Sequence, residues 1–114
     1  MSKGWIGVDL DGTLAEYHGW KSNRDIGEPI PAMVDRVKEW STQGKNIKIF
    51  TARVAEDDPE ELETVIQVIR LWCIKHLGFT LPITNVKDYA MIECWDDRSI
   101  QVIKNTGKRA DGEE

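Results

Sequence analysis

Polar side chains that could bind a cation or a phosphate group follow four apolar segments of this sequence. They are Asp9, Asp11, Thr51, Lys87, Asp96 and Asp97. Four carboxylates brought together without a cation would repel one another strongly, so the acidic residues predict a bound metal ion. Carboxylate oxygens are typical ligands of Mg²⁺, which is also the ion most often paired with phosphate chemistry.

The first apolar segment is expected to form a buried parallel strand over residues 4–10. Side chains two positions apart on a strand point the same way, so Asp9 and Asp11 can converge where the strand stops. Gly12 and Thr13 then provide a turn. Ligands of open α/β sheets bind at this edge, beyond the carboxyl ends of the strands.

Further strands and helices are expected to alternate along the chain. The predicted elements are a helix over 31–43, a strand over 46–50, a helix over 59–76, strands over 81–86 and 91–95, and a last short helix over 99–105. Pro31 suits a first helical position, and Gly44 and Gly78 suit helix ends. Strand–helix–strand units are right-handed and bring the strand ends to one edge, so Thr51 should lie near Asp9. The pattern predicts an α/β protein with a mainly parallel sheet.

The composition is that of one globular domain covering residues 1–114. The hydrophobic fraction is 40%, and the net charge is −5. This charge argues against non-specific binding to nucleic acid or to an acidic membrane. Because no signal peptide and no run of membrane-spanning length is present, a cytoplasmic protein is expected.

The remaining predictions concern two irregular segments, the two cysteines and one of the helices. Residues 15–29 lack a sustained period and are expected to form a flap beside Asp11, whereas residues 106–114 read as a flexible tail. Cys73 and Cys94 lie among apolar neighbours and are expected to be buried, reduced thiols. The helix over 59–76 has an apolar stripe wider than one sheet face needs, which suggests a homo-oligomer.

The run from Asp9 to Leu14 reads Asp-Leu-Asp-Gly-Thr-Leu and resembles the first motif of the haloacid-dehalogenase-like (HAD) superfamily. Thr51, Lys87 and the Asp96–Asp97 pair follow in the order of that family's other three motifs. The resemblance covers residues 5–103. It implies a three-layer Rossmann-like fold and the activity of a Mg²⁺-dependent phosphatase.

The resemblance also implies a role for each motif residue. Asp9 would be the nucleophile that becomes a phospho-aspartate, and Asp11 the general acid and base. Thr51 would donate a hydrogen bond to a phosphoryl oxygen, and Lys87 would contribute positive charge. The expected metal-binding residues are Asp9, Asp11, Asp96 and Asp97. One residue of the last pair should bind the ion directly, with Asp97 favoured by the Asp-Asp-Arg ending.

The substrate is expected to be a phosphorylated small molecule or a nucleic-acid end. The expected substrate-binding residues are Gly12, Thr13, Trp20, Arg24, Ala52 and Arg53. The intervals between the motifs leave no room for a cap domain, so the chain resembles the small capless members of the family, whose sites are open. No membrane partner is expected.

Two other functions use similar residue types. A signalling receiver also combines acidic residues, a Thr and a Lys around Mg²⁺, but its phospho-acceptor Asp follows a mid-chain strand. Here that strand ends in Thr51, which argues against a receiver. A non-catalytic module that binds Mg²⁺ or phosphate on the same fold remains the alternative, because fold alone does not give function.

Overall fold

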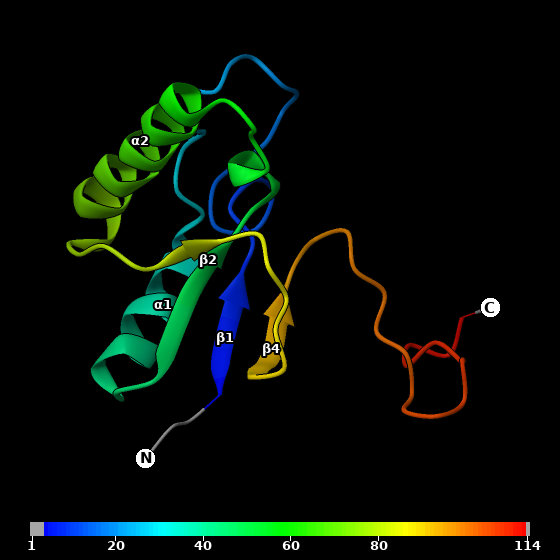
Figure 1. Ribbon diagram of the computed structural model, residues 1–114. Coiled ribbons are helices and arrows are strands. Elements are labelled where there is room, and N and C mark those ends of the chain that lie inside the picture. The colour runs from blue at the N-terminus through cyan, green and yellow to red at the C-terminus, as the bar shows by residue number, and fades with distance from the viewer. Residues whose placement is uncertain (1–3, 114) are drawn as a thin grey trace.

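The computed structural model describes residues 4–113 and contains one parallel sheet and two long helices (Figure 1). The elements follow one another in the chain. They are β1 (Trp5–Val8), α1 (Pro31–Thr42), β2 (Asn46–Phe50), the short 3₁₀ helix η1 (Ala52–Val54), α2 (Pro59–Leu77), β3 (Ile83–Thr84) and β4 (Met91–Trp95). The strand order is β3-β2-β1-β4, and every pairing is parallel. The predicted α/β class without a cap domain is therefore confirmed.

The predicted element bounds agree closely with these, with two exceptions. The third strand, expected over 81–86, keeps only two residues. The helix expected over 99–105 is wrong: Val102 instead pairs antiparallel with Arg109 around a turn in which Asn105 and Gly107 both have positive φ. The β-branched residues before this turn favour an extended backbone, and the turn residues favour a reversal of the chain.

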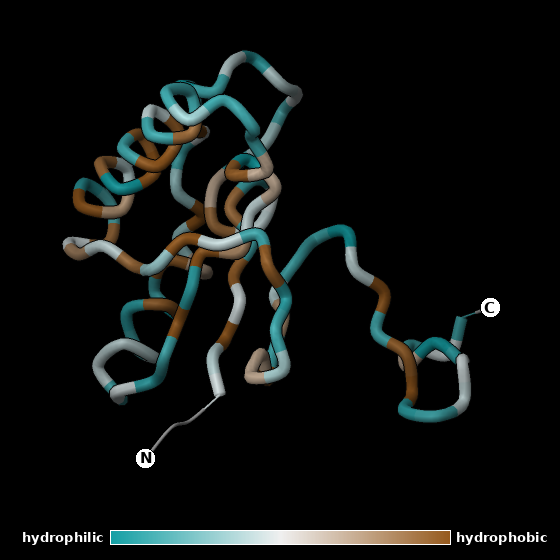
Figure 2. The backbone as a smooth tube through the Cα atoms, viewed as in Figure 1, coloured by the Kyte–Doolittle hydropathy of each residue, from teal (hydrophilic) through white to brown (hydrophobic). Residues whose placement is uncertain are grey.

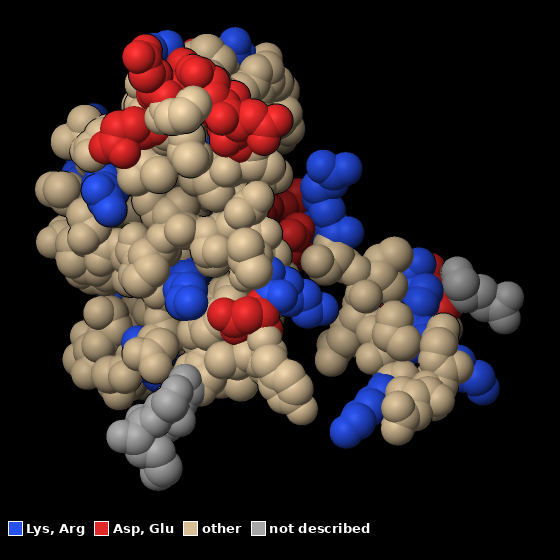
Figure 3. Space-filling model, in the orientation of Figure 1, with Lys and Arg blue, Asp and Glu red and all other residues tan. Residues whose placement is uncertain are grey.

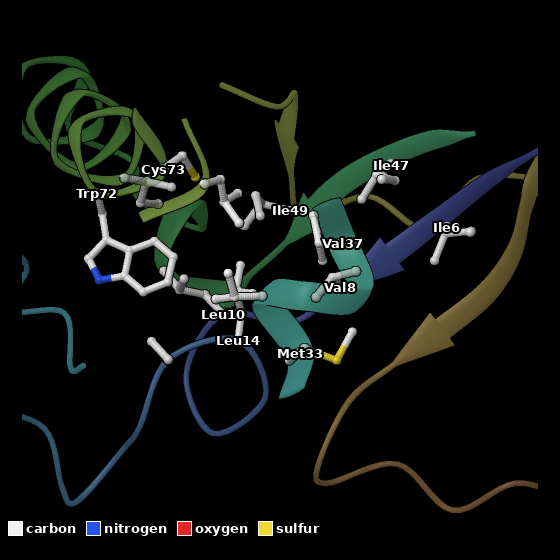
Figure 4. Close-up of a cluster of buried hydrophobic side chains, with 14 of the residues drawn as sticks. Ile6, Val8, Leu10, Leu14, Met33, Val37, Ile47, Ile49, Trp72 and Cys73 are labelled. Carbon is white, nitrogen blue, oxygen red and sulfur yellow. The ribbon is translucent and has the colours of Figure 1, made fainter. Parts of the chain in front are cut away.

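Both helices lie on the same face of the sheet. The chain steps from β1 to β2 to β3 in one direction, and right-handed crossovers then place α1 and α2 on one side. The two helices touch each other, and they enclose a single apolar core (Figure 4). The core contains Ile6, Val8, Leu10, Leu14, Met33, Val37, Ile47, Ile49, Val65, Ile69, Trp72 and Cys73.

The third layer of the expected three-layer fold is not formed by the described residues 4–113. The sheet face opposite the helices carries Phe50 and Cys94 and is called here the open face. Among residues 4–113, the loop between β3 and β4 crosses this face, and its Asp88 accepts a hydrogen bond of 2.8 Å from the Trp5 indole. The prediction that Cys94 is buried is therefore wrong, whereas Cys73, under α2, is buried as predicted.

The two ends of α2 follow the expected capping chemistry. The Asp58 side chain accepts a hydrogen bond of 3.0 Å from the backbone N–H of Glu61, and Gly78 ends the helix in the left-handed conformation. Within the described residues, neither helix has the length and apolar run needed to cross a membrane.

Candidate functional site

Three of the predicted metal-binding carboxylates lie together at the carboxyl edge of the sheet. Carboxylate oxygens of Asp9, Asp96 and Asp97 all lie within 4.8 Å of one another. Asp9 follows β1, and the Asp pair follows β4, its neighbour in the sheet. A hydrogen bond of 2.9 Å from the Asp9 N–H to the Trp95 carbonyl continues the strand pairing up to this point. The parallel register of two adjacent strands therefore produces the cluster.

The environment of Asp9 disfavours a free negative charge. Burial, then the charge of Asp96, then a hydrogen bond with the Asp97 carboxyl raise the pKa of Asp9 to about 7. A hydrogen bond of 2.9 Å from the backbone N–H of Leu10 acts in the opposite direction and is weaker. Three carboxyl groups held this closely carry more negative charge than their surroundings neutralise, which is the electrostatic setting of a cation site.

The Gly12–Thr13 turn fixes the position of Asp97. The Thr13 hydroxyl lies 3.2 Å from one oxygen of Asp97 and accepts a hydrogen bond of 3.1 Å from its backbone N–H. Gly12 has a φ of +87°, and a Cβ atom added there would lie 2.6 Å from the other Asp97 oxygen. These two predicted substrate-binding residues thus contact a carboxylate of the cluster, and only glycine fits at residue 12.

Asp11 does not join the cluster, because its carboxylate is bound by Arg53. Arg53 Nε lies 2.7 Å from Asp11 Oδ2, and Arg53 Nη2 lies 2.8 Å from Asp11 Oδ1. The Arg53 side chain is only 5% exposed. A bidentate pair of this kind is the strongest geometry available to a guanidinium and a carboxylate. The sequence predicted both residues for the site but not their contact.

The flap, residues 15–29, holds Arg53 from the other side. Its guanidinium donates to the backbone carbonyls of Asn23 and Asp25, at 3.4 and 2.7 Å. The Trp20 ring lies over the same guanidinium, 4.9 Å from centroid to Cζ, in a cation–π arrangement. Arg24 is exposed and lines none of the cavities around Asp9 or Asp11. The flap therefore contacts the site through the Trp20 ring and through the backbone, and substrate binding by Trp20 and Arg24 stays a prediction.

Thr51 and Ala52 lie beside Asp9 at the end of β2. The Thr51 side chain is buried, and its hydroxyl accepts a hydrogen bond of 3.1 Å from the Arg53 N–H, which caps η1. The Thr51 hydroxyl can still donate its own hydrogen atom to another acceptor. Two adjoining cavities of about 430 and 350 Å³ both contain Asp9, Thr51 and Ala52 in their walls. A phosphate group entering either cavity would meet the Asp9 carboxylate and the Thr51 hydroxyl together.

Lys87 lies apart from these cavities. It lines a separate groove on the open face, together with Phe50, Cys94 and Asp96. Within residues 4–113, no hydrogen bond or ion pair joins it to Asp9 or to the Asp96–Asp97 pair. Since β3 ends at Thr84, Lys87 falls in the loop that crosses the open face rather than at a strand end. The structure therefore does not bring this predicted residue to the cavity that contains Asp9.

Three residues with no firm prediction also line the cavities. Arg98 lines both cavities beside Asp9. Asn85 lines the cavity of about 430 Å³, and Asn23 lines the cavity of about 350 Å³. Asn85 directly follows β3, so the rule that drew attention to strand ends could have found it. Asn23 depends on the path of the flap, which has no periodic signal in the sequence.

The comparisons with known proteins show the fold and no family. No protein-family model matches this chain, and no curated protein sequence matches it. A solved structure described as a conserved protein from Bacteroides thetaiotaomicron is similar, with a TM-score of 0.57 and 22% sequence identity. The similarity covers 86% of this chain and 78% of that one. At this identity the similarity supports the small Rossmann-like architecture alone.

Proposed function

We propose that this chain is a Mg²⁺-dependent phosphomonoester hydrolase of the HAD type that acts through a phospho-aspartate on Asp9. The observation that carries the proposal is the cluster of Asp9, Asp96 and Asp97 oxygens within 4.8 Å, in a cavity that also holds the Thr51 hydroxyl. The order of the four motifs in the sequence is the second support. The substrate class is a phosphorylated small molecule or a nucleic-acid end.

The residues of the cluster fit a magnesium ion. Asp9, Asp96 and Asp97 would hold it, because hard oxygen donors are its preferred ligands and three crowded carboxylates need a cation. When bound, Mg²⁺ would neutralise charge on the phosphoryl oxygens and on Asp9. Asp97 is positioned by Thr13, and Asp96 by the Arg98 N–H at 2.8 Å, so neither carboxylate has to be ordered when the ion arrives.

Asp9 is the nucleophile in this proposal. One of its oxygens attacks phosphorus and forms an acyl phosphate, while the bond from phosphorus to the ester oxygen breaks. The departing alkoxide takes a proton from Asp11, which must first leave its ion pair with Arg53 and take up that proton from solvent. A water molecule then attacks phosphorus, Asp11 takes the water proton, and inorganic phosphate leaves with Asp9 regenerated. The Thr51 hydroxyl donates to a phosphoryl oxygen throughout.

The pairing of Asp11 with Arg53 imposes a condition on this sequence of steps. Both carboxylate oxygens of Asp11 accept hydrogen bonds from Arg53, so neither is available to carry a proton to the leaving group. Arg53 must therefore release at least one oxygen when the substrate binds. A phosphate group in the cavity that Arg53 also lines offers the guanidinium another anion, which supplies a reason for the exchange.

A non-catalytic Mg²⁺- or phosphate-binding module is the alternative function. Two observations favour it: Asp11 is fully engaged by Arg53, and Lys87 lies outside the cavity that contains Asp9. Such a module would bind Mg²⁺ through the same cluster but would release no phosphate. Binding and turnover must therefore be measured separately.

The test is phosphate release from aryl phosphates, nucleotides and oligonucleotides phosphorylated at either end, with Mg²⁺ or with a chelator. We expect release that requires Mg²⁺ and is lost in Asp9→Asn. Asp35→Asn is the matched control, because Asp35 is exposed on α1 away from the cluster. Calorimetric titration with Mg²⁺ accompanies each assay. Mg²⁺ binding without release from any substrate would contradict the phosphatase and support the module, and full activity in Asp9→Asn would contradict the mechanism.

A further inference from the structure

Residues 100–113, called here the C-terminal arm, stand away from the rest of the protein (Figure 1). The hydrogen bonds of this segment in the described structure all join arm residues to one another. They include Ile103 N–H to Lys108 carbonyl and Ala110 N–H to Gln101 carbonyl, both at 2.8 Å. The arm is thus a small hairpin of its own, built around the Val102–Arg109 bridge.

The arm buries none of its apolar side chains. Ile100, Val102 and Ile103 are 57, 50 and 49% exposed. Figure 2 shows two hydrophobic stretches in the arm, one on the segment that leads away from the body and one in the hairpin itself. A hairpin this short has no core of its own, so its apolar side chains need a surface elsewhere to pack on.

None of the helices or strands in residues 4–113 covers the open face of the sheet. A groove of about 710 Å³ lies between this face and the start of the arm, which contributes Ile100 and Gln101 to its lining. The sheet contributes the apolar side chains of Phe50, Ile92 and Cys94, and the charged residues Lys87, Glu93 and Asp96 also line the groove. Ile92 is 64% exposed, and in the described part of the chain β4 pairs only with β1, which leaves the outer edge of β4 unpaired there. A sheet normally buries both faces of its parallel strands, and an unpaired edge strand is a site for further pairing.

The direction in which the chain leaves β4 keeps the arm off its own sheet. Asp96 Oδ1 accepts a hydrogen bond of 2.8 Å from the Arg98 N–H, and this turn sets the exit path. Beyond it the hairpin extends outward, away from β4 (Figure 1). A fold-back onto the same sheet would require this turn to open.

The charges of the arm and of the body are complementary. The turn of the arm, residues 104–109, carries three basic side chains, and the rest of the described arm carries the acidic Asp111 and Glu113, so the arm has a net charge of +1. Arg109 pairs with Asp111 at 2.9 Å. Residues 4–99 carry eleven basic and seventeen acidic side chains. Figure 3 shows blue side chains on the arm with some red among them, and the largest red area at the top of the body. The basic turn of the arm therefore favours contact with another copy of this protein, whose body has a net negative charge.

We propose that the arm of one copy packs across the open face of a second copy, and that the exchange is reciprocal, giving a twofold dimer. A twofold exchange covers two arms and two open faces at once, and exchange of an identical element is a common route to dimers. The occupant of the groove is thus the apolar pair Val102 and Ile103 of the other copy, which would pack beside the Ile100 that already lines the groove. The proposal is independent of the phosphatase activity.

The first test measures molar mass by light scattering after size-exclusion chromatography. We expect the unmodified protein to be a dimer, and Val102→Asp and Ile92→Asp to be monomers with unchanged circular dichroism. Ile74→Asp is the matched control: Ile74 is 53% exposed on α2, on the opposite side of the sheet from the groove. A monomeric unmodified protein would overturn the proposal. So would a dimer that only Ile74→Asp dissociates, because it would then form through α2.

The second test locates the arm by cross-linking and does not depend on destabilising the dimer. One variant carries Val102→Cys together with Cys94→Ser, and an isotope-labelled unmodified protein supplies Cys94 on its open face. After co-refolding, a short bis-maleimide should join one labelled and one unlabelled chain. Cys73 is buried and should stay unreacted. In a variant with both Cys94 and Val102→Cys, cross-linking within one chain at high dilution would show that the arm covers its own sheet and would overturn the proposal. Absence of any cross-link would overturn it as well.

Discussion

Arg53 and Asp11 form a bidentate ion pair, with Arg53 Nε 2.7 Å from Asp11 Oδ2 and Arg53 Nη2 2.8 Å from Asp11 Oδ1. The pair joins the end of β2 to the turn after β1, and the same guanidinium donates to two flap carbonyls. One side chain therefore connects the two strand ends that border the candidate site to the flap that covers it.

We expect Arg53→Ala to lower the free energy of unfolding by about 3 kcal/mol, because it leaves the part-buried Asp11 carboxylate without its partner. The Arg53→Ala/Asp11→Ala double variant should lose less than the sum of the single losses. Denaturation by urea measures both. Arg109→Ala is the matched control: its pair with Asp111 is 33 and 54% exposed, so the loss of stability should be much smaller. Equal losses for the two arginine variants would contradict the role of Arg53.

Stability should depend on pH through Asp9 when no metal is present. The pKa of Asp9 in the folded protein is about 7, raised from 3.8 by burial and by its acidic neighbours, so the folded state favours the protonated carboxyl. The metal-free protein should therefore lose stability as the pH rises from about 4 to 7. Because Asp9 is only partly buried, we expect a loss on the order of 1 to 2 kcal/mol.

Thermal melting with chelator at a series of pH values between 4 and 8 checks this expectation. In Asp9→Asn the decline should flatten, and the melting temperature at pH 8 should rise, because one of three crowded charges is gone. Mg²⁺ should restore the stability of the unmodified protein at pH 8 and have little effect on Asp9→Asn. A melting temperature that rises between pH 4 and pH 7 in the metal-free protein would contradict the assignment.

The close contact between Gly12 and Asp97 predicts a second effect on metal binding. Gly12→Ala should cost about 1 to 3 kcal/mol of stability, because it combines a φ of +87° with a Cβ atom 2.6 Å from Asp97 Oδ2. It should also weaken Mg²⁺ binding by displacing that carboxylate. Gly44 has a similar φ of +78° and no neighbouring atom within 4 Å of an added Cβ. Gly44→Ala should therefore lose stability through backbone strain and leave Mg²⁺ binding unchanged. Calorimetric titration with Mg²⁺ would contradict the prediction if both variants bound the ion equally.

The sequence predicted the parts of the site that depend on strand geometry. Asp9, Asp96 and Asp97 meet because β1 and β4 are adjacent and parallel, and Thr51 lies beside them at the end of β2. Strand alternation and the handedness of crossovers are local rules, and they suffice for this edge. The core faces of α1 and α2 followed from helical spacing for the same reason.

The sequence did not predict the contacts made by irregular segments. The Arg53–Asp11 pair depends on the path of the flap, and Lys87 depends on β3 stopping at Thr84. The run Ile100–Ile103 is short and apolar, and periodicity alone does not distinguish a helix from an extended segment at that length. Here the turn formed by Asn105 and Gly107 decided in favour of the extended form. The exposure of Cys94 then followed, because no second helical layer covers the open face.

Substitutions at Thr51 can distinguish a role of its hydroxyl in capping η1 from a role in catalysis. Thr51→Val keeps the shape of a side chain that is 3% exposed but removes both the cap on η1 and the donor facing the cavity. We expect a loss of about 1 kcal/mol in stability and a fall in kcat of about 10² if the hydroxyl stabilises a phosphoryl oxygen. Thr51→Ser should recover most of the activity.

Thr84→Val is the matched control. The Thr84 hydroxyl accepts the same kind of hydrogen bond, 3.0 Å from the Val86 N–H, but it lies at the end of β3 and outside the two cavities. Steady-state rates with the best phosphoryl substrate check the prediction, and equal losses of kcat in Thr51→Val and Thr84→Val would assign Thr51 a structural role only.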